Sequence, residues 1–326
     1  MNQLKLGIFI LLLLFIPLLP ALENIIHYMN LIFFFTALTA AWNIISGFGG
    51  QLSLGHSAFF AVGAYTSTLL YMNYGLTPWI GMILGAVLSL PVAFMIGYPT
   101  FRLRGTYFVL STLALAEVVR RLIMYFKGIT KGSVGISLPV TGNPWLLQFP
   151  SEIGYYYLLL SFAFLVLFIG WKVRTSRMGY FVFGIREDEE AAAALGVNVA
   201  KYKMIALLIS AFFTAMTGSI YAQWKCYIDP DTVGGLELSV QIALAGILGG
   251  MGTVWGPLAG ATIFVSAHAV GLAASGGLIG GVYMIYGTLL IVAILIRPQG
   301  VIGLIEDALQ FLFNRWPDRS TAGGAH

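Results

Sequence analysis

The sequence predicts an all-α, polytopic transmembrane protein, and three observations lead to that class. Of its 326 residues, 59% are hydrophobic and only 9% are charged, whereas about 25% of the residues in a soluble domain carry charge. No Asp, Glu, Lys or Arg occurs between Glu23 and Arg102, or between Glu237 and Arg297. Both runs are continuously apolar instead of alternating at every second residue, which excludes a membrane barrel. At about 20 residues per crossing, they hold several helical spans.

Hydrophobicity and loop residues divide the chain into about ten candidate spans. The run 6–22 resembles a signal peptide, but Pro17, Pro20 and Glu23 leave no small-residue cleavage site, so we expect a retained first span. The run 239–252 has 14 residues, about 21 Å of helix, which is short for an apolar core of about 30 Å. One or two spans are therefore expected to be broken or re-entrant. The spans are residues 6–22, 28–46, 57–73, 77–98, 106–126, 153–171, 203–223, 239–252, 254–274 and 278–296.

The basic residues predict the orientation of these spans. If all ten cross, one side carries 12 Lys and Arg residues and the other side carries five. Because cytoplasmic loops are rich in Lys and Arg, we expect both termini to lie in the cytoplasm. The expected inner residues are Lys5, Arg102, Arg104, Lys172, Arg174, Arg177, Arg186, Lys201, Lys203, Arg297, Arg315 and Arg319. The expected outer residues are Arg120, Arg121, Lys127, Lys131 and Lys225.

Two loops are long enough to hold structure of their own. The outer loop Lys127–Glu152 is rich in Gly, Ser, Thr and Pro, and the inner loop Lys172–Lys203 is rich in charge. A water-soluble partner would dock on the inner loop. Because the sequence holds no soluble domain of ordinary size, we expect residues 1–326 to form one transmembrane domain that includes the inner loop 172–203.

The inner loop contains REDEEAAAALGVN, Arg186–Asn198, which predicts a short helix. Asp188 is a plausible N-cap, Glu189 and Glu190 occupy the first turn, and Gly196 can end the helix in the left-handed conformation. A helix of about eight residues does not persist alone in water, so it must pack against something. Its alanine-rich face permits close approach of a partner. The alternative interpretation is an ordinary surface helix at a span boundary.

A glycine-rich stretch, GGQLSLGHSAFFAVGAYTS (Gly49–Ser67), lies inside the longest charge-free run. Small residues let membrane helices pack closely, and broken helices expose backbone groups where they line a cavity. The stretch LGGMGTVWGPLAGA (Leu248–Ala261) corresponds to Gly49–Ser67: each stretch follows a span that runs from outside to inside and precedes one that runs from inside to outside. This correspondence suggests an internal repeat. Tight helix packing alone is the competing explanation. The candidate solute contacts are Gln51, Ser53, His56 and Ser57.

The ionisable residues of the spans are few. Glu117 has Arg120 and Arg121 at i+3 and i+4, the spacing of helix ion pairs, so we interpret it as part of a charge cluster at the outer end of its span. A coupling role for Glu117 and His268 belongs to the competing hypothesis of a solitary carrier. The sequence has no catalytic triad, no metal-ligand spacing and no phosphate-binding Walker loop. It therefore predicts no catalytic residue and no metal site. No nucleic-acid partner is expected either, because the basic residues form no clustered patch with interleaved aromatic residues.

Five segments carry a resemblance to a known family. They are Gly49–Ser67, PTFRLRGTYF (Pro99–Phe108), Arg186–Asn198 followed by Tyr202 and Lys203, YIDPD (Tyr227–Asp231) and Leu248–Ala261. In order and spacing they resemble the LivM-type inner-membrane permease subunit of branched-chain amino-acid ABC transporters, over roughly Trp42–Gly303. One departure falls in the outer loop, where Lys131 replaces the first glycine of a Thr-Gly-Gly-x-x-Gly pattern.

The resemblance implies a transmembrane permease subunit of an ATP-driven importer in the bacterial cell inner membrane, and not an enzyme. Its implied partners are a second related permease subunit, two cytoplasmic ABC ATPase subunits, an extracytoplasmic solute-binding protein and an amino-acid substrate. ATP and Mg would be bound by the partner ATPase, with no cofactor on this chain. The inner loop 172–203 then becomes a coupling loop. The ATPase-coupling candidates are Arg186, Glu187, Asp188, Glu189, Glu190, Ala193 and Gly196.

The solute does not follow from the resemblance as firmly as the architecture does. Branched-chain or other apolar amino acids are expected, because they are the most frequent solutes of the family that the chain resembles. A mostly apolar path with isolated hydroxyl and amide groups would suit such a solute. An importer for urea or short amides is the first alternative. A stand-alone secondary transporter is the second, although a solitary carrier does not need an acidic, alanine-rich inner helix. An integral membrane enzyme is disfavoured, since no acid/base or metal constellation is visible in the sequence.

Overall fold

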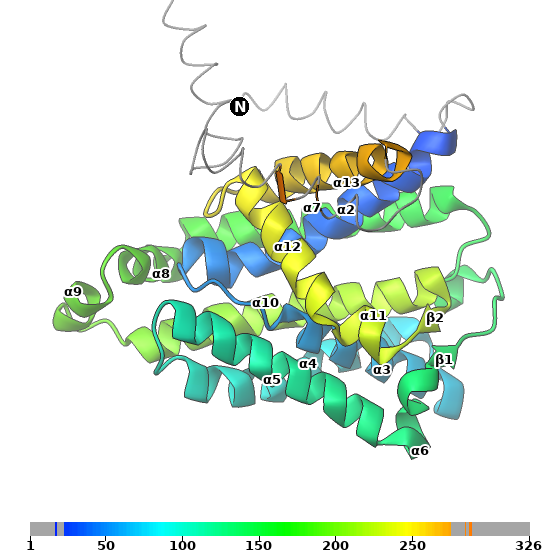
Figure 1. Ribbon diagram of the computed structural model, residues 1–326, viewed down its shortest axis with the longest axis horizontal. Helices are drawn as coiled ribbons and strands as arrows, with labels where there is room; N and C mark the ends of the chain where they lie inside the picture. The colour runs from blue at the N-terminus through cyan, green and yellow to red at the C-terminus, as the bar shows by residue number, and fades with distance from the viewer. Residues whose placement is uncertain (1–16, 18–22, 275–283, 285–286, 289–326) are drawn as a thin grey trace, which may run out of the picture.

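The structure is a computed structural model that describes residues 23–274 together with residues 17, 284, 287 and 288 (Figure 1). The expected spans 6–22 and 278–296 and both chain termini lie outside the continuous described range. Within that range the fold is helical, with one two-stranded antiparallel sheet that pairs Ile136 with Ile228. The all-α class predicted from the sequence is thus confirmed for the described part of the chain.

Twelve α-helices are described. In chain order they are α2 (Glu23–Asn43), α3 (His56–Tyr74), α4 (Pro78–Thr100), α5 (Thr106–Tyr125), α6 (Lys127–Thr130), α7 (Glu152–Thr175), α8 (Arg177–Glu187), α9 (Glu189–Ala194), α10 (Val199–Lys225), α11 (Pro230–Gly234), α12 (Leu236–Gly249) and α13 (Gly256–Ala274). The shorter elements are a π-turn (Ile44–Phe48), two 3-10 turns (Gly132–Val134 and Pro144–Leu146) and strands β1 (Ile136–Ser137) and β2 (Tyr227–Ile228).

Each expected span between residues 28 and 274 forms a helix. Four of the described helices are long and apolar enough to cross a membrane: Ile25–Phe48, Pro78–Thr100, Glu152–Thr175 and Val199–Lys225. The other expected spans form α3, α5, α12 and α13. The segment predicted to be short is indeed short, since α12 has 14 residues.

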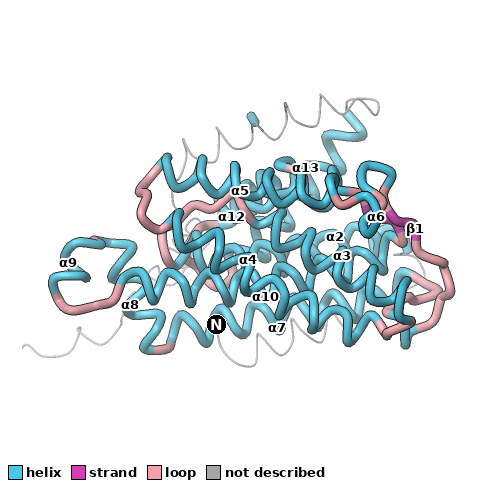
Figure 2. The backbone as a smooth tube through the Cα atoms, turned by 90° about the horizontal axis from the view of Figure 1, so that it is seen from below, coloured by secondary structure: helices cyan, strands magenta, loops and turns pink. Residues whose placement is uncertain are grey.

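The helices run along the long axis of the molecule, and the two long loops lie at its opposite ends. Figure 1 shows α8 and α9 at one end and β1, β2 and α6 at the other. Figure 2 shows the same arrangement from below, with α9 projecting beyond the bundle. We call these the α9 end and the β end. The inner and outer loops therefore lie apart, as the sequence predicts, and the cytoplasmic side assigned to the α9 end stays a prediction.

The centre of the bundle is a close crossing of α3 and α10 at glycine. A Cβ on Gly63 would overlap the carbonyl oxygen of Ala215, and a Cβ on Gly218 would overlap that of Phe60. Ser219 Oγ donates a hydrogen bond of 2.9 Å across the crossing to the Gly63 carbonyl. Small residues therefore set the distance between these two helices, as they commonly do in membrane bundles. The close helix packing expected from the small residues of Gly49–Ser67 is thus confirmed at Gly63.

Candidate functional site

The first glycine-rich segment breaks a helix inside the protein. After α2 the chain makes the π-turn and then runs without regular structure until α3 begins at His56. Neighbouring side chains satisfy the backbone of this stretch: Trp42 Nε1 donates to the Ser53 carbonyl at 2.8 Å, and Leu54 N donates to Thr112 Oγ1 at 3.1 Å. Irregular backbone at membrane depth is tolerated where protein groups satisfy it in this way. The break in the helix is therefore stabilised by hydrogen bonds from the surrounding helices.

The second glycine-rich segment interrupts the chain in the same manner between α12 and α13. Gly250 and Gly252 have φ values of 108° and 82°, a region open mainly to glycine. Thr253 Oγ1 accepts a hydrogen bond from Gly256 N at 3.0 Å and donates one to the Gly250 carbonyl at 2.9 Å. Each half of the expected repeat thus contains an irregular stretch that connects two helices.

The two breaks touch each other through one asparagine. Asn43 Nδ2 donates to the Thr253 carbonyl at 2.8 Å, and Asn43 Oδ1 accepts from Gly252 N at 2.9 Å. A Cβ on Gly47 would lie 2.6 Å from Gly252 N, so the backbones meet only because Gly47 lacks a side chain. Sequence reasoning missed Asn43. Its partners are more than 200 positions away in the chain, and no local pattern reveals such a contact.

Arg186 joins the inner loop to both breaks. Its Nη1 donates a hydrogen bond of 2.8 Å to the Gly47 carbonyl. Its aliphatic carbons lie against Gly50, and its guanidinium lies beside Gly252, where a Cβ would overlap it. Arg186 therefore connects the end of α8 to the backbone of both breaks.

Arg186 and Glu187 end α8, a helix not predicted from the sequence, and the alanine-rich helix α9 begins separately after Asp188. The reason is the backbone of Asp188, which is extended (φ −153°, ψ 109°) and stops α8 before α9 can start. An N-cap residue needs this conformation, so the cap that starts α9 also separates it from Arg186. The alanine-rich helix α9 consequently has six residues, fewer than expected.

Both predicted ends of α9 are confirmed. Asp188 Oδ1 accepts hydrogen bonds from the backbone N–H groups of Glu190 and Ala191, at 2.9 and 3.0 Å. At the other end Gly196 has a φ of 86°. Val197 N bonds to the Ala192 carbonyl and Gly196 N to the Ala193 carbonyl, which is the hydrogen-bond pattern of a Schellman motif. These caps define the short helix although it is too short to be stable by itself.

The acidic first turn of α9 is bound to two other elements. Glu189 Oε2 lies 2.7 Å from Lys203 Nζ on α10, and the Lys203 side chain is only 2% exposed. Glu190 pairs with Arg104, in the connection between α4 and α5, at 2.7 Å on the exposed surface. The hydrogen bond to Glu190 raises the pKa of Arg104 above its ordinary value. The exposed side of α9 carries Ala191, Ala193 and Ala194.

The four candidate solute contacts gather around the start of α3. Ser53, His56 and Ser57 are buried, and Gln51 is half-buried. His56 Nε2 lies 2.7 Å from Ser210 Oγ on α10. His56 Nδ1 and Ser57 Oγ have no hydrogen-bond partner among the residues that the structure describes. Their contact with a solute stays a prediction.

The charge cluster expected around Glu117 is confirmed in the second half of α5, and its outer location stays a prediction. Arg120 donates two hydrogen bonds to Glu117, at 2.6 and 2.7 Å, and Arg121 donates one at 2.7 Å. The structure adds a partner that sequence reasoning missed, because Arg120 also pairs with Asp231 of α11. The YIDPD segment contained a sequence signal for this contact. Asp229 caps the short helix α11, and α11 packs against α5.

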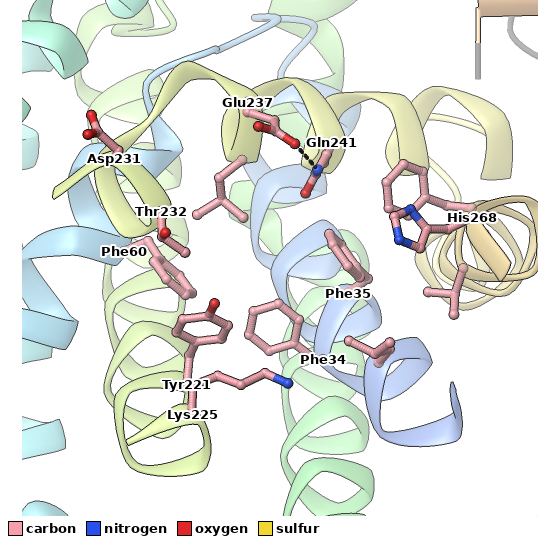
Figure 3. A pocket seen from close by; sticks show the side chains of 14 residues that line it. Phe34, Phe35, Phe60, Tyr221, Lys225, Asp231, Thr232, Glu237, Gln241 and His268 are labelled. Carbon is pink, nitrogen blue, oxygen red and sulfur yellow. Dashed lines mark hydrogen bonds between the residues drawn. The ribbon is translucent and has the colours of Figure 1, made fainter. Parts of the chain in front are cut away.

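A cavity of about 410 Å³ opens at the β end among α2, α3, α10, α11, α12 and α13 (Figure 3). Sequence reasoning missed it because its lining comes from six separate helices. Aromatic rings form most of the apolar lining, and Lys225, Glu237 and Gln241 are among its polar residues. The aromatic lining residues are Phe34, Phe35, Phe60, Tyr221 and Phe264. His268 also lines it, whereas none of the four candidate solute contacts does.

Comparison with known proteins places the chain in a family. A family model described as the permease component of branched-chain amino acid transport systems matches residues 24–296. The high-affinity branched-chain amino acid transport system permease protein LivM of Salmonella typhimurium (strain LT2) is 28% identical over 291 residues, which cover 82% of this chain and 67% of LivM.

Two further relatives are informative. The corresponding permease protein LivH of the same organism is 24% identical over 291 residues, which cover 83% of this chain and 92% of LivH. The autoinducer 2 import system permease protein LsrC of Enterobacter sp. (strain 638) is 28% identical over 195 residues, which cover 56% of each chain.

Proposed function

We propose a function from the premise that this chain belongs to the family of permease components of branched-chain amino acid transport systems. It is a multi-pass membrane protein and a permease subunit of an ABC importer, and such a subunit is not itself catalytic. We infer further that it is a LivM-type subunit and that its solutes are branched-chain or other apolar amino acids. The similarity to LivM supports this choice.

The arrangement of α8 and α9 carries the mechanistic part of the proposal. A capped helix with an exposed alanine face projects from the bundle and offers a docking element for an ATPase (Figure 2). Arg186, at the end of α8, contacts both glycine-rich breaks. ATPase movement transmitted through α9 and α8 would therefore shift the broken helices that border the candidate solute contacts.

The partners follow from the same proposal. The chain is similar to both LivM and LivH, which are named as permease proteins of one kind of system, and this supports a second related permease subunit. Two cytoplasmic ATPase subunits would bind ATP and Mg, and an extracytoplasmic binding protein would deliver the solute. Residues 1–326 form one transmembrane domain of about ten spans, with 172–203 as its coupling loop.

The charge distribution supports the orientation. In the described range, the helix ends and loops at the α9 end carry eight Lys and Arg residues, and those at the β end carry five. The α9 end is accordingly assigned to the cytoplasm of a bacterial inner membrane, together with both termini. Labelling of single cysteines placed at positions 190 and 131 should report opposite sides, and labelling from one side would overturn the assignment.

Two other functions are weighed against this one. An importer for urea or short amides would use the same architecture, and the similarity to LsrC shows that other solutes occur among the relatives. A solitary proton-coupled carrier would use Glu117, but Glu117 accepts hydrogen bonds from both Arg120 and Arg121, which favours a structural role.

Uptake by the reconstituted system separates the three functions. We expect leucine, isoleucine and valine to enter proteoliposomes only when ATP and the ATPase are supplied, with no direct effect of collapsing the proton gradient. Preferential uptake of urea or acetamide would show that the chain belongs to an importer for urea or short amides. Leucine uptake that follows the proton gradient without ATP would support the solitary carrier and contradict the proposal.

A further inference from the structure

We propose that the end of α4 and the connection after it form a binding site for an anionic phospholipid. Arg102 would bind the lipid phosphate, Tyr98 would position Arg102, and the exposed apolar face of α4 would contact an acyl chain. Arg102 belongs to PTFRLRGTYF (Pro99–Phe108), one of the five segments of the family resemblance, to which the proposed function gives no role.

Helix α4 has two faces that differ in the size of their side chains. The buried face, toward the bundle, includes the small residues Gly81, Gly85, Ala86, Ser89 and Ala93. The opposite face exposes large apolar side chains, namely Ile83, Leu84, Val87, Leu88, Phe94 and Met95. Contacts between membrane helices are enriched in small residues. The exposed face of large side chains therefore suits acyl chains better than a second protein helix.

The exposed face ends in a stack of two aromatic rings and one guanidinium group. The ring centroids of Phe94 and Tyr98 are 6.0 Å apart, and the ring planes are inclined by 25°. The guanidinium carbon of Arg102 lies 5.2 Å from the centroid of the Tyr98 ring, and Arg102 Nη2 donates a hydrogen bond of 3.2 Å to the Tyr98 hydroxyl. Tyr98 thus orients Arg102 in advance, which lowers the entropy cost of binding a ligand.

The charge of Arg102 is not compensated by a carboxylate of the described part of the chain, since none of the ion pairs there includes it. The neighbouring Arg104 differs, because it pairs with Glu190 of α9 at 2.7 Å. A guanidinium group has five N–H donors, and Tyr98 accepts from only one nitrogen of Arg102. The remaining donors can bind a phosphate through two parallel hydrogen bonds, the geometry that arginine commonly uses.

The site lies where a lipid headgroup would be. The span Pro78–Thr100 is long and apolar enough to cross a membrane, and Arg102 follows its end by two residues. Tyrosine and arginine are typical of this level, because their apolar parts face the acyl chains and their polar ends face the headgroups. Phosphatidylglycerol is favoured over phosphatidylcholine, since it brings no cation of its own near the guanidinium. Only the choice of the inner leaflet rests on the proposed function, which assigns the α9 end to the cytoplasm.

Photo-cross-linking tests the site on the purified full-length protein with the subunits that co-purify with it. A phosphatidylglycerol with a diazirine in its acyl chain should label peptides from the exposed face of α4. Unlabelled phosphatidylglycerol should compete at least tenfold better than phosphatidylcholine with the same acyl chains, and soluble glycerol phosphate should not compete. This comparison needs no variant, so it does not depend on how a substitution affects folding. Labelling that spares α4, equal competition by the two lipids, or competition by glycerol phosphate overturns the proposal.

Variants then assign the groups. Arg102→Gln should reduce the labelling of α4 at least fivefold and abolish the preference for phosphatidylglycerol. Tyr98→Phe keeps the ring and removes the hydrogen bond to Arg102, so it should reduce labelling less than Arg102→Gln does. The matched control is Arg177→Gln, which removes an exposed arginine at the start of α8 and should leave labelling unchanged.

Unchanged labelling and unchanged lipid preference in Arg102→Gln refute the site. The assay uses neither ATP nor a transported solute, so such a result refutes only the lipid site and leaves the proposed function standing. Failure of ATP-dependent leucine uptake by the wild-type system would refute the proposed function and leave the lipid site standing.

Discussion

Lys203 Nζ of α10 lies 2.7 Å from Glu189 Oε2 of α9, and the lysine side chain is 2% exposed. A buried ammonium needs a partner, because an unpaired charge in such a place is strongly unfavourable. The partner comes from the helix that projects toward the proposed ATPase. Through this pair the six-residue helix α9 is held to the long helix α10 and does not depend on its own stability.

Loss of this partner should destabilise the protein. Glu189→Gln removes the carboxylate and leaves the Lys203 ammonium buried, which we expect to lower the free energy of unfolding by about 3 kcal/mol or less, since Glu189 is partly exposed. The matched control is Glu190→Gln, whose pair with Arg104 is solvent-exposed and should change stability little. Thermal unfolding in detergent compares the two variants. Equal melting temperatures would mean that the buried Glu189–Lys203 pair does not contribute to the stability of the protein.

Arg186 should be needed for coupling and not for assembly. Arg186→Ala removes the hydrogen bond to the Gly47 carbonyl, so the ATPase should still co-purify while leucine transported per ATP hydrolysed falls at least tenfold. Arg177→Ala, which removes an exposed arginine at the other end of α8, should leave that ratio unchanged. The account of the two breaks is wrong if both variants transport with wild-type stoichiometry.

Glycine at the α3–α10 crossing should tolerate no side chain. Gly63→Ala forces the helices apart, because the added Cβ overlaps the Ala215 carbonyl oxygen, while the nearest atom to a Cβ on Gly55 is at 3.2 Å. Transport should therefore fall strongly in Gly63→Ala and less in Gly55→Ala. The control is Gly170→Ala on α7, where a Cβ meets nothing within 4 Å. A helix gains up to about 1 kcal/mol from this change, so the control should stay active.

The outer loop should gain stability from a glycine. Lys131 has a φ of 62°, and the left-handed conformation costs a residue with a side chain about 1–2 kcal/mol. Lys131→Gly should therefore slow cleavage of the Lys127–Glu152 loop by added protease, whereas Lys127→Gly, in the short helix α6, should not. Faster cleavage in Lys131→Gly would show that the side chain makes a contact worth more than the strain.

Features that depend on residues close together in the chain could be predicted from the sequence. The charge-free runs, the caps Asp188 and Gly196 and the Glu117 cluster depend on residues a few positions apart, so composition and spacing reveal them. The contact of Asn43 with Gly252 and the lining of the cavity depend on how distant helices pack. Asp188 was predicted correctly as the cap of α9, whereas the separate helix α8, which ends immediately before it, was not predicted.

The measurement closest to the central claim is ATPase binding by Ala193→Arg. Ala193 lies on the exposed face of α9, where a docked ATPase would approach the backbone closely. Burying an unpaired guanidinium in that contact costs several kcal/mol, and each 1.4 kcal/mol is a tenfold change in affinity. We predict that co-purification of the ATPase and its solute-stimulated hydrolysis both fall at least tenfold, while Ala200→Arg, exposed on α10, retains both. Wild-type values in Ala193→Arg would contradict the assignment of α9 as the coupling element.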